Sequence, residues 1–160
     1  MLCRNRAKGD QAAADLGQLT SRPANFIVHE VDVARPAAVR AFCRDFAAGQ
    51  QRLDALINNA GVLMGERLET PDGLEVAFAT NILGPYLMTE GLVDLLQRTP
   101  GSRVVTVTSG GMLTVRLDAT NPQYVVANSD AKYDGTRQYA LNKRAQVELT
   151  HHWAVTHARI

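Results

Sequence analysis

The sequence has few cysteines, no excess of either charge and no long apolar run. Its two cysteines, Cys3 and Cys43, stand too far apart for a disulfide framework or a Cys-x-x-Cys metal motif. Lys and Arg number 17 and Asp and Glu 16, so we expect no nucleic-acid partner. No run of about 18 apolar residues exists, so no membrane span is expected. The N-terminus does not resemble a signal peptide, and we expect a cytoplasmic protein with reduced thiols.

Short apolar runs alternate with longer segments of helical period, which predicts a parallel sheet covered by helices. Strands are expected at the strand tail Met1–Cys3 and over Asn25–Val33, Leu53–Ile57 and Ser102–Val107. Helices are expected over Ala7–Leu19, Pro36–Gly49, Asp72–Gln97 (with a kink at Gly84-Pro85) and from Thr136 to the C-terminus. Ser109–Asp134 is polar and rich in turn residues. This order predicts one α/β domain over residues 1–160 with a doubly wound parallel sheet.

A tyrosine and a lysine on the last predicted helix are the first candidates for chemistry. Tyr139 and Lys143 are four residues apart, so both side chains lie on one face of the helix. A cation beside a phenol favours the phenolate, which suits proton transfer to or from a carbonyl or alcohol oxygen. Such a pair arises by chance in roughly one chain in ten and needs support from other residues.

Three further features supply that support. Ser109 follows the apolar strand Ser102–Val107, at the sheet edge where ligands bind in this architecture. Asn58-Asn59-Ala60-Gly61 directly follows another strand, and its small residues let the backbone approach a ligand closely. Asn81 falls within an apolar helical pattern, where a buried amide needs a partner. The alternative roles are a turn or cap serine, an ordinary turn and a surface asparagine.

The histidines near the C-terminus do not suggest a metal site. His151, His152 and His157 have no Cys or carboxylate at a supporting spacing. We expect no bound metal.

Together these residues resemble the short-chain dehydrogenase/reductase superfamily. The resemblance covers nearly the whole chain, and the 30-residue separation of Ser109 from Tyr139 is similar to that of its retinol-dehydrogenase-like branch. It implies that Asn81, Ser109, Tyr139 and Lys143 match the catalytic tetrad. In that family the tyrosine is the acid/base, the serine positions the carbonyl, the lysine assists the tyrosine and holds the cofactor ribose, and the asparagine anchors a water.

The resemblance also implies cofactor contacts. Asn58, Asn59, Ala60 and Gly61 match the family element that supports the sheet and lines the adenosine side. Asp32 and Val33 match the position that contacts the adenine. Arg4 stands where members that prefer NADP carry a basic residue, and a guanidinium suits the 2′-phosphate better than a bare ribose. We therefore expect NADP(H), with NAD(H) the less favoured alternative.

The family's glycine-rich phosphate-binding turn and its first strand are missing from the sequence, as are the elements that follow the tyrosine's helix. In the family's strand order 3-2-1-4-5 the first strand is central. We thus expect an incomplete Rossmann-like fold, truncated at both ends, whose second and fourth strands lose their shared neighbour. The isolated chain is expected to be marginally stable.

Two functions of different classes follow from these residues. The first is a partial NADP(H)-dependent oxidoreductase that interconverts a carbonyl and an alcohol on an apolar small molecule, with a homodimer as a further expectation. The second is a non-catalytic truncated product that binds no cofactor. A weaker third interpretation is an extended sugar-nucleotide epimerase, which shares the Tyr-x-x-x-Lys spacing but fits Asn58–Gly61 and Ser109 less well.

Overall fold

The computed structural model describes residues 1–21, 25–125, 132–158 and 160. The chain forms two compact units, residues 1–33 and 34–160, each of which is described by itself. The irregular segment expected over Ser109–Asp134 includes residues 126–131, which lie outside the described part.

The first unit joins one helix to a pair of short strands. β1 (Leu2–Cys3) pairs in parallel with β2 (His29–Glu30), and α1 (Arg6–Thr20) connects them. The Asn5 side chain caps α1 by accepting a hydrogen bond from the Lys8 amide at 3.0 Å. A Cβ atom on Gly9 would lie 2.6 Å from Val28 Cγ1, so α1 packs against the strands through a residue without a side chain.

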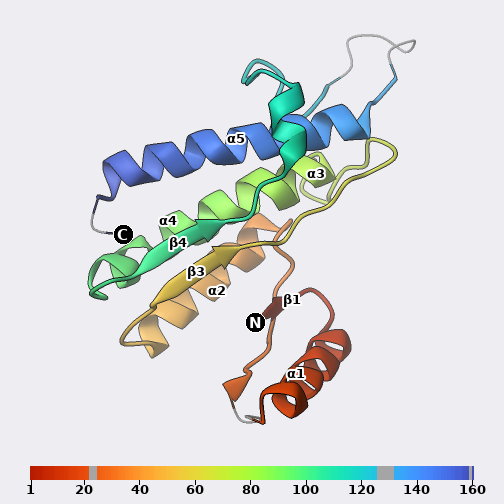
Figure 1. The fold of residues 1–160 in the computed structure, drawn as a ribbon. Coiled ribbons are helices and arrows are strands. Elements are labelled where there is room, and N and C mark those ends of the chain that lie inside the picture. Colours follow the sequence, from red (N-terminus) through yellow and green to blue (C-terminus); the bar gives the residue numbers. More distant parts are fainter. Residues whose placement is uncertain (22–24, 126–131, 159) are drawn as a thin grey trace. The chain divides into compact units, whose positions relative to one another are not determined.

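The second unit holds the other strand pair and most of the helices (Figure 1). Its elements are α2 (Pro36–Gly49), β3 (Ala55–Asn58), α3 (Val76–Phe78), the π-helical turn η2 (Ala79–Leu83), α4 (Gly84–Gln97), β4 (Arg103–Thr106), the 3₁₀ helix η3 (Gly110–Thr114) and α5 (Gly135–Thr156). β3 and β4 are parallel, with Ala55 opposite Arg103 and Asn58 opposite Thr106. Parallel pairing confirms the predicted α/β class.

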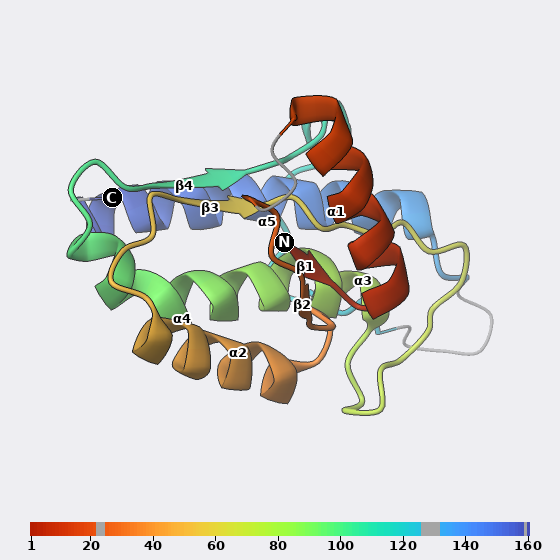
Figure 2. The same ribbon diagram turned by 90° about the horizontal axis from the view of Figure 1, so that it is seen from below.

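Helices cover one face of the β3–β4 pair. Figure 2 shows α2 and α4 on the same side of the two strands, with α5 running along β4. On the opposite face Ile57 and Val105 are 62% and 41% exposed, in register with the side-chain alternation of a strand. β1 with β2 and β3 with β4 form two separate two-stranded sheets.

The predicted helix over Asp72–Gln97 is wrong at its start and confirmed at its interruption. Residues 69–75 instead form a turn closed by a bridge between Glu69 and Glu75, with Gly73 at a φ of 74°. Helix α3 begins only at Val76, because the Glu75 carboxylate caps it. The kink expected at Gly84-Pro85 is the π turn η2 that immediately precedes these residues.

Helices α2 and α4 cross at a glycine. A Cβ atom on Gly91 would lie 2.8 Å from Cys43 Cβ and 2.9 Å from its Sγ. The Cys43 thiol is buried there, with Sγ 3.6 Å from Met88 Sδ, and burial raises its pKa to about 11. Both cysteines are free thiols. The thiol of Cys43 therefore serves packing, and the absence of a side chain at position 91 permits the close crossing.

Gly91→Ala should lower the free energy of unfolding by about 1–3 kcal/mol, because the Cys43 Cβ cannot rotate away and the helices must separate. Gly49→Ala is the matched control, since nothing lies within 4 Å of a Cβ atom there. The control should be neutral or stabilising by up to about 1 kcal/mol from helix propensity. Urea denaturation measures both variants, and equal effects at the two positions would contradict the crossing.

Candidate functional site

The predicted tyrosine and lysine lie one turn apart on α5, close to the end of β4. Lys143 Nζ lies 5.5 Å from the centroid of the Tyr139 ring. The lysine is 3% exposed and its Nζ donates a hydrogen bond to the Val107 carbonyl at 2.7 Å. Burial lowers the pKa of Lys143 because it removes hydration from the ammonium. An ammonium has three donors, and the bond to Val107 uses one of them.

The start of α5 is fixed by a cap and by a close backbone contact. The Asp134 side chain accepts a hydrogen bond from the Arg137 amide at 2.9 Å. A Cβ atom on Gly135 would lie 1.6 Å from the Met64 carbonyl oxygen, so only glycine fits this position. The helix therefore begins directly against the segment that follows β3, four residues before Tyr139.

The Asn58–Gly61 segment divides into a buried residue and an exposed turn. Asn58 is buried, its Nδ2 donates to Thr89 Oγ1 at 3.1 Å, and its carbonyl accepts from the Val107 amide at 3.0 Å. Asn58 thus joins β3 to α4 and to the strand beside it. Asn59, Ala60 and Gly61 are exposed.

Gly61 lies beside two of the other predicted residues. A Cβ atom on Gly61 would lie 3.4 Å from Asn81 Oδ1 and 3.6 Å from Lys143 Nζ. The backbone of the exposed turn therefore lies in van der Waals range of the buried lysine and of Asn81.

Asn81 holds that turn in place from the π turn η2. Its side chain accepts from the Val62 amide at 2.8 Å and donates to the Val62 carbonyl at 2.9 Å. Its own carbonyl accepts from Gln146 Nε2 at 2.7 Å. In a regular helix this carbonyl would bond to residue 85, but Pro85 has no N–H and leaves it to the glutamine. The buried asparagine therefore links the turn after β3 to α5.

Ser109 lies in the turn that follows β4. It is the N-cap of η3, and its Oγ accepts a hydrogen bond from the Gly111 amide at 3.3 Å. A Cβ atom on Gly111 would lie 3.9 Å from the Ala140 Cβ, so this turn rests against the residue after Tyr139. Thr108 Oγ1 also donates to the Lys143 carbonyl at 2.8 Å. The serine oxygen is used as an acceptor, and the hydroxyl keeps its proton to donate.

The structure brings Gly61, Asn81, Tyr139 and Lys143 into one neighbourhood, with the Ser109 turn beside it. Arg4, Asp32 and Val33 belong to residues 1–33, whose position relative to residues 34–160 is not determined, so their assignment stays a prediction. Among the described residues no group of three or more His, Cys, Asp and Glu side chains could hold a metal ion.

Sequence reasoning missed several residues that shape this neighbourhood. Gln138 and Gln146 are fully buried on α5, and Val107 contributes its carbonyl to the lysine. A signal for the glutamines was present, because Gln138, Asn142 and Gln146 repeat every four residues beside the Tyr139–Lys143 pair. No sequence signal marked Val107, since its role comes from the backbone.

No helix within the described ranges is both long and apolar enough to cross a lipid bilayer.

Comparison with known sequences identifies relatives over the whole chain. The short chain dehydrogenase family profile matches residues 1–121. Dehydrogenase/reductase SDR family member 12 of Bos taurus is 40% identical over 160 residues, which is 100% of this chain and 49% of that protein. Retinol dehydrogenase 14 of Homo sapiens is 33% identical over 94% of this chain and 46% of its own length. The chain thus spans about half the length of the curated relatives it matches.

Solved structures share the fold. The structure titled "ElxO with NADP Bound" superposes with a TM-score of 0.70 at 22% identity, over 98% of this chain and 56% of that one. A short-chain dehydrogenase from Streptomyces avermitilis has a TM-score of 0.67 at 23% identity, over 98% of this chain and 50% of that one. These likenesses confirm an incomplete Rossmann-like fold, and together with the sequence matches they establish that this chain belongs to the short-chain dehydrogenase/reductase family.

Proposed function

We propose that this chain carries the catalytic centre of an NADP(H)-dependent oxidoreductase that interconverts a carbonyl and an alcohol on an apolar small molecule. The observation that carries the proposal is the buried Lys143 beside Tyr139, with the exposed turn at Gly61 next to its ammonium. Retinol dehydrogenase 14, a relative, is named for an apolar alcohol, which supports the substrate class.

Tyr139 is the proposed acid/base, which gives a proton to the carbonyl oxygen or takes one from the alcohol. Lys143, held by the Val107 carbonyl, keeps two donors for the tyrosine oxygen and a ribose hydroxyl. The Ser109 hydroxyl donates a hydrogen bond to the substrate oxygen and stabilises the charge that develops there. The Asn81 carbonyl has a second lone pair after its bond with Gln146, which could hold a water of a proton relay.

The residues around Gly61 fit a nicotinamide cofactor. The small, exposed turn at Asn59, Ala60 and Gly61 would lie along it, and Lys143 would hold its ribose. A bound NADP(H) would supply or accept the hydride. NADP bound in the similar ElxO structure supports the phosphorylated cofactor, and Arg4, an exposed residue of the first unit, is the proposed contact for its 2′-phosphate.

Tyr139→Phe should reduce NADPH-dependent reduction of an apolar aldehyde such as nonanal by about 100-fold or more in the full-length protein, because the proton donor is lost. Tyr86→Phe is the matched control, since Tyr86 is 39% exposed on α4 and should leave the rate unchanged. Stopped-flow absorbance of NADPH measures both. Unchanged turnover in Tyr139→Phe would remove the tyrosine from the mechanism.

Saturating NADPH should raise the melting temperature of the full-length protein, since a ligand that binds only the folded state adds about 2.7 kcal/mol of stability at a hundred times its Kd. NADH should give a smaller shift, and Arg4→Ala should reduce the NADPH shift to the NADH level. Equal shifts for both cofactors in the wild type would overturn the role of Arg4. A melting temperature indifferent to both would favour the non-catalytic alternative.

The buried lysine also predicts a pH dependence of stability. Burial lowers the pKa of Lys143 in the folded chain, whereas an unfolded chain holds that proton up to about pH 10.4. Between the lowered value and the ordinary one the unfolded state binds more protons, so stability rises with pH in that window.

The free energy of unfolding of the wild type, minus that of Lys143→Met, should therefore increase from about pH 7 to about pH 10. Urea denaturation at several pH values measures it. Lys132→Met, at an exposed lysine of the same unit, should follow the wild-type curve. Parallel curves for wild type and Lys143→Met would mean that the ammonium stays hydrated in the folded chain.

A further inference from the structure

One face of α5 is polar and yet buried. Gln138, Asn142 and Gln146 stand at intervals of four residues and are 0%, 3% and 1% exposed. Residues at this spacing line a single stripe along a helix. Two of the three adjoin the proposed catalytic pair, since Gln138 directly precedes Tyr139 and Asn142 directly precedes Lys143. Whatever binds this stripe also determines which way the pair faces.

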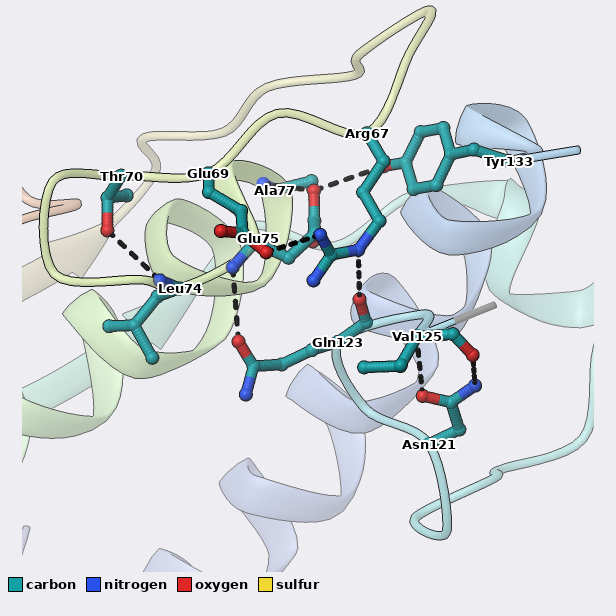
Figure 3. Close-up of polar contacts among 10 residues, drawn as sticks. All are labelled: Arg67, Glu69, Thr70, Leu74, Glu75, Ala77, Asn121, Gln123, Val125 and Tyr133. Carbon is teal, nitrogen blue, oxygen red and sulfur yellow. Dashed lines mark hydrogen bonds and ion pairs between the residues drawn. The ribbon is translucent and has the colours of Figure 1, made fainter. Parts of the chain in front are cut away.

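The partner at the N-terminal end of the stripe is a buried carboxylate, Glu75, which is 0% exposed. Its Oε1 accepts from the Ala77 amide at 2.7 Å and from the Tyr133 hydroxyl at 3.1 Å. Its Oε2 accepts from the Phe78 amide at 2.6 Å and from Gln138 Nε2 at 3.1 Å. Figure 3 shows the carboxylate between the start of α3 and Tyr133. Four donors, two of them amides at the start of α3, stabilise the buried carboxylate.

The same amide of Gln138 reaches two further acceptors. Its Nε2 lies 2.9 Å from the Pro122 carbonyl and 3.3 Å from Asn142 Oδ1. Because a carboxylate only accepts hydrogen bonds, the Gln138 amide must present its NH₂ group to Glu75. The orientation of the side chain is thus dictated by its partners, and the segment before residue 126 is held by the same contact that holds the helix.

A second anchor lies two turns further along α5. Gln146 Nε2 donates to the Asn81 carbonyl at 2.7 Å, and Pro85, four residues after Asn81, has no N–H to offer that carbonyl. Gln138 and Gln146 are separated by about 12 Å along the helix axis at the usual rise per residue. Two directional contacts at this separation define both the rotation of α5 about its axis and its position along that axis.

Apolar packing alone would define these less sharply, because it is not directional. Rotating α5 by one residue, about 100°, would turn Gln138 away from Glu75 and leave a buried charge with fewer partners. That loss is costly because Glu75 is fully buried. The buried polar contacts therefore select one orientation of the helix, and with it one placement of Tyr139 and Lys143.

We infer that Glu75 is a positioning residue for the proposed reaction: through Gln138 it sets the orientation of α5 and so the placement of the Tyr139–Lys143 pair against the ends of β3 and β4. The inference rests on the proposed function for its effect on turnover. Its structural half, the placement of Lys143, is independent of that function. A residue that merely capped α3 would stabilise the chain without affecting turnover or the placement of Lys143.

The test compares Glu75→Ala, Glu75→Gln and Gln138→Leu in the full-length protein, at a temperature where circular dichroism shows each variant to be folded. Gln138→Leu leaves the caps to Ala77 and Phe78 intact and removes the Gln138 amide that bonds to Glu75, Pro122 and Asn142, so it stands in if Glu75→Ala does not fold. Glu148→Gln is the control, a residue on the same helix that pairs with Arg144 at the surface.

We expect Glu75→Ala and Gln138→Leu each to lower kcat by about tenfold to a hundredfold, the effect of misplacing a catalytic group by about 1 Å, while KM for NADPH changes less than about threefold. Glu75→Gln keeps a carbonyl oxygen that accepts, and it should recover part of kcat. Glu148→Gln should match the wild type. The double variant Glu75→Ala with Gln138→Leu should lower kcat little more than either single variant, because both substitutions remove the bond between Glu75 and Gln138.

The second readout does not depend on catalysis. The titration of Lys143, followed by the NMR signal of its 13Cε and assigned with Lys143→Met, should move toward that of a hydrated lysine in Glu75→Ala and Gln138→Leu. Folded variants with unchanged kcat and an unchanged Lys143 titration would overturn the inference and leave Glu75 as a cap of α3. If Tyr139→Phe keeps its activity, the proposed function fails, and the titration alone still decides the placement by Glu75.

Discussion

Hydrogen bonds stabilise buried polar side chains, and three such side chains of helix α5 bond to three other segments of the chain. Gln138 bonds to Glu75 ahead of α3, Lys143 to the carbonyl after β4, and Gln146 to Asn81 in η2. Loss of any of these bonds would weaken the hydrogen bonding of a buried polar group, which costs stability. The arrangement of the elements around Tyr139 depends on these contacts, because each joins the helix to a segment far away in sequence.

The same region relies on residues that lack ordinary side chains or donors. Gly135 admits the Met64 backbone at the start of α5, where a Cβ atom would lie 1.6 Å from the carbonyl oxygen. Pro85 withholds an N–H group and so frees the Asn81 carbonyl for Gln146. In each case the missing atom permits a contact between segments. This explains why the motif residues alone do not describe the site: its shape also depends on what neighbouring positions lack.

The chain belongs to a family whose matched members are about twice its length. The chain matches its curated relatives over about half of their length, and the similar solved structures likewise extend beyond it. The face of β3 and β4 opposite the helices keeps Ile57 and Val105 exposed within residues 34–160. The proposed turnover is therefore to be tested on the full-length protein, whereas contacts within residues 34–160 already define the placement of Lys143 and Tyr139.

The sequence by itself determined the class of fold and the candidate residues. Apolar periodicity located α2 at the residues where it is found, and the spacing of Tyr139 and Lys143 predicted their shared helix face, since both depend on local geometry. The helix predicted to begin at Asp72 begins instead at Val76, because the cap by Glu75 and the turn at Gly73 outweighed helix propensity over residues 72–75.

Only the tertiary structure decided which polar residues meet. Asn58 bonds to Thr89, Gln138 to Glu75, and Lys143 to a backbone carbonyl. These partners lie 31 to 63 residues apart, and their pairing follows from how helices pack on a strand pair. Residue type and spacing along the chain carry no direct record of that packing.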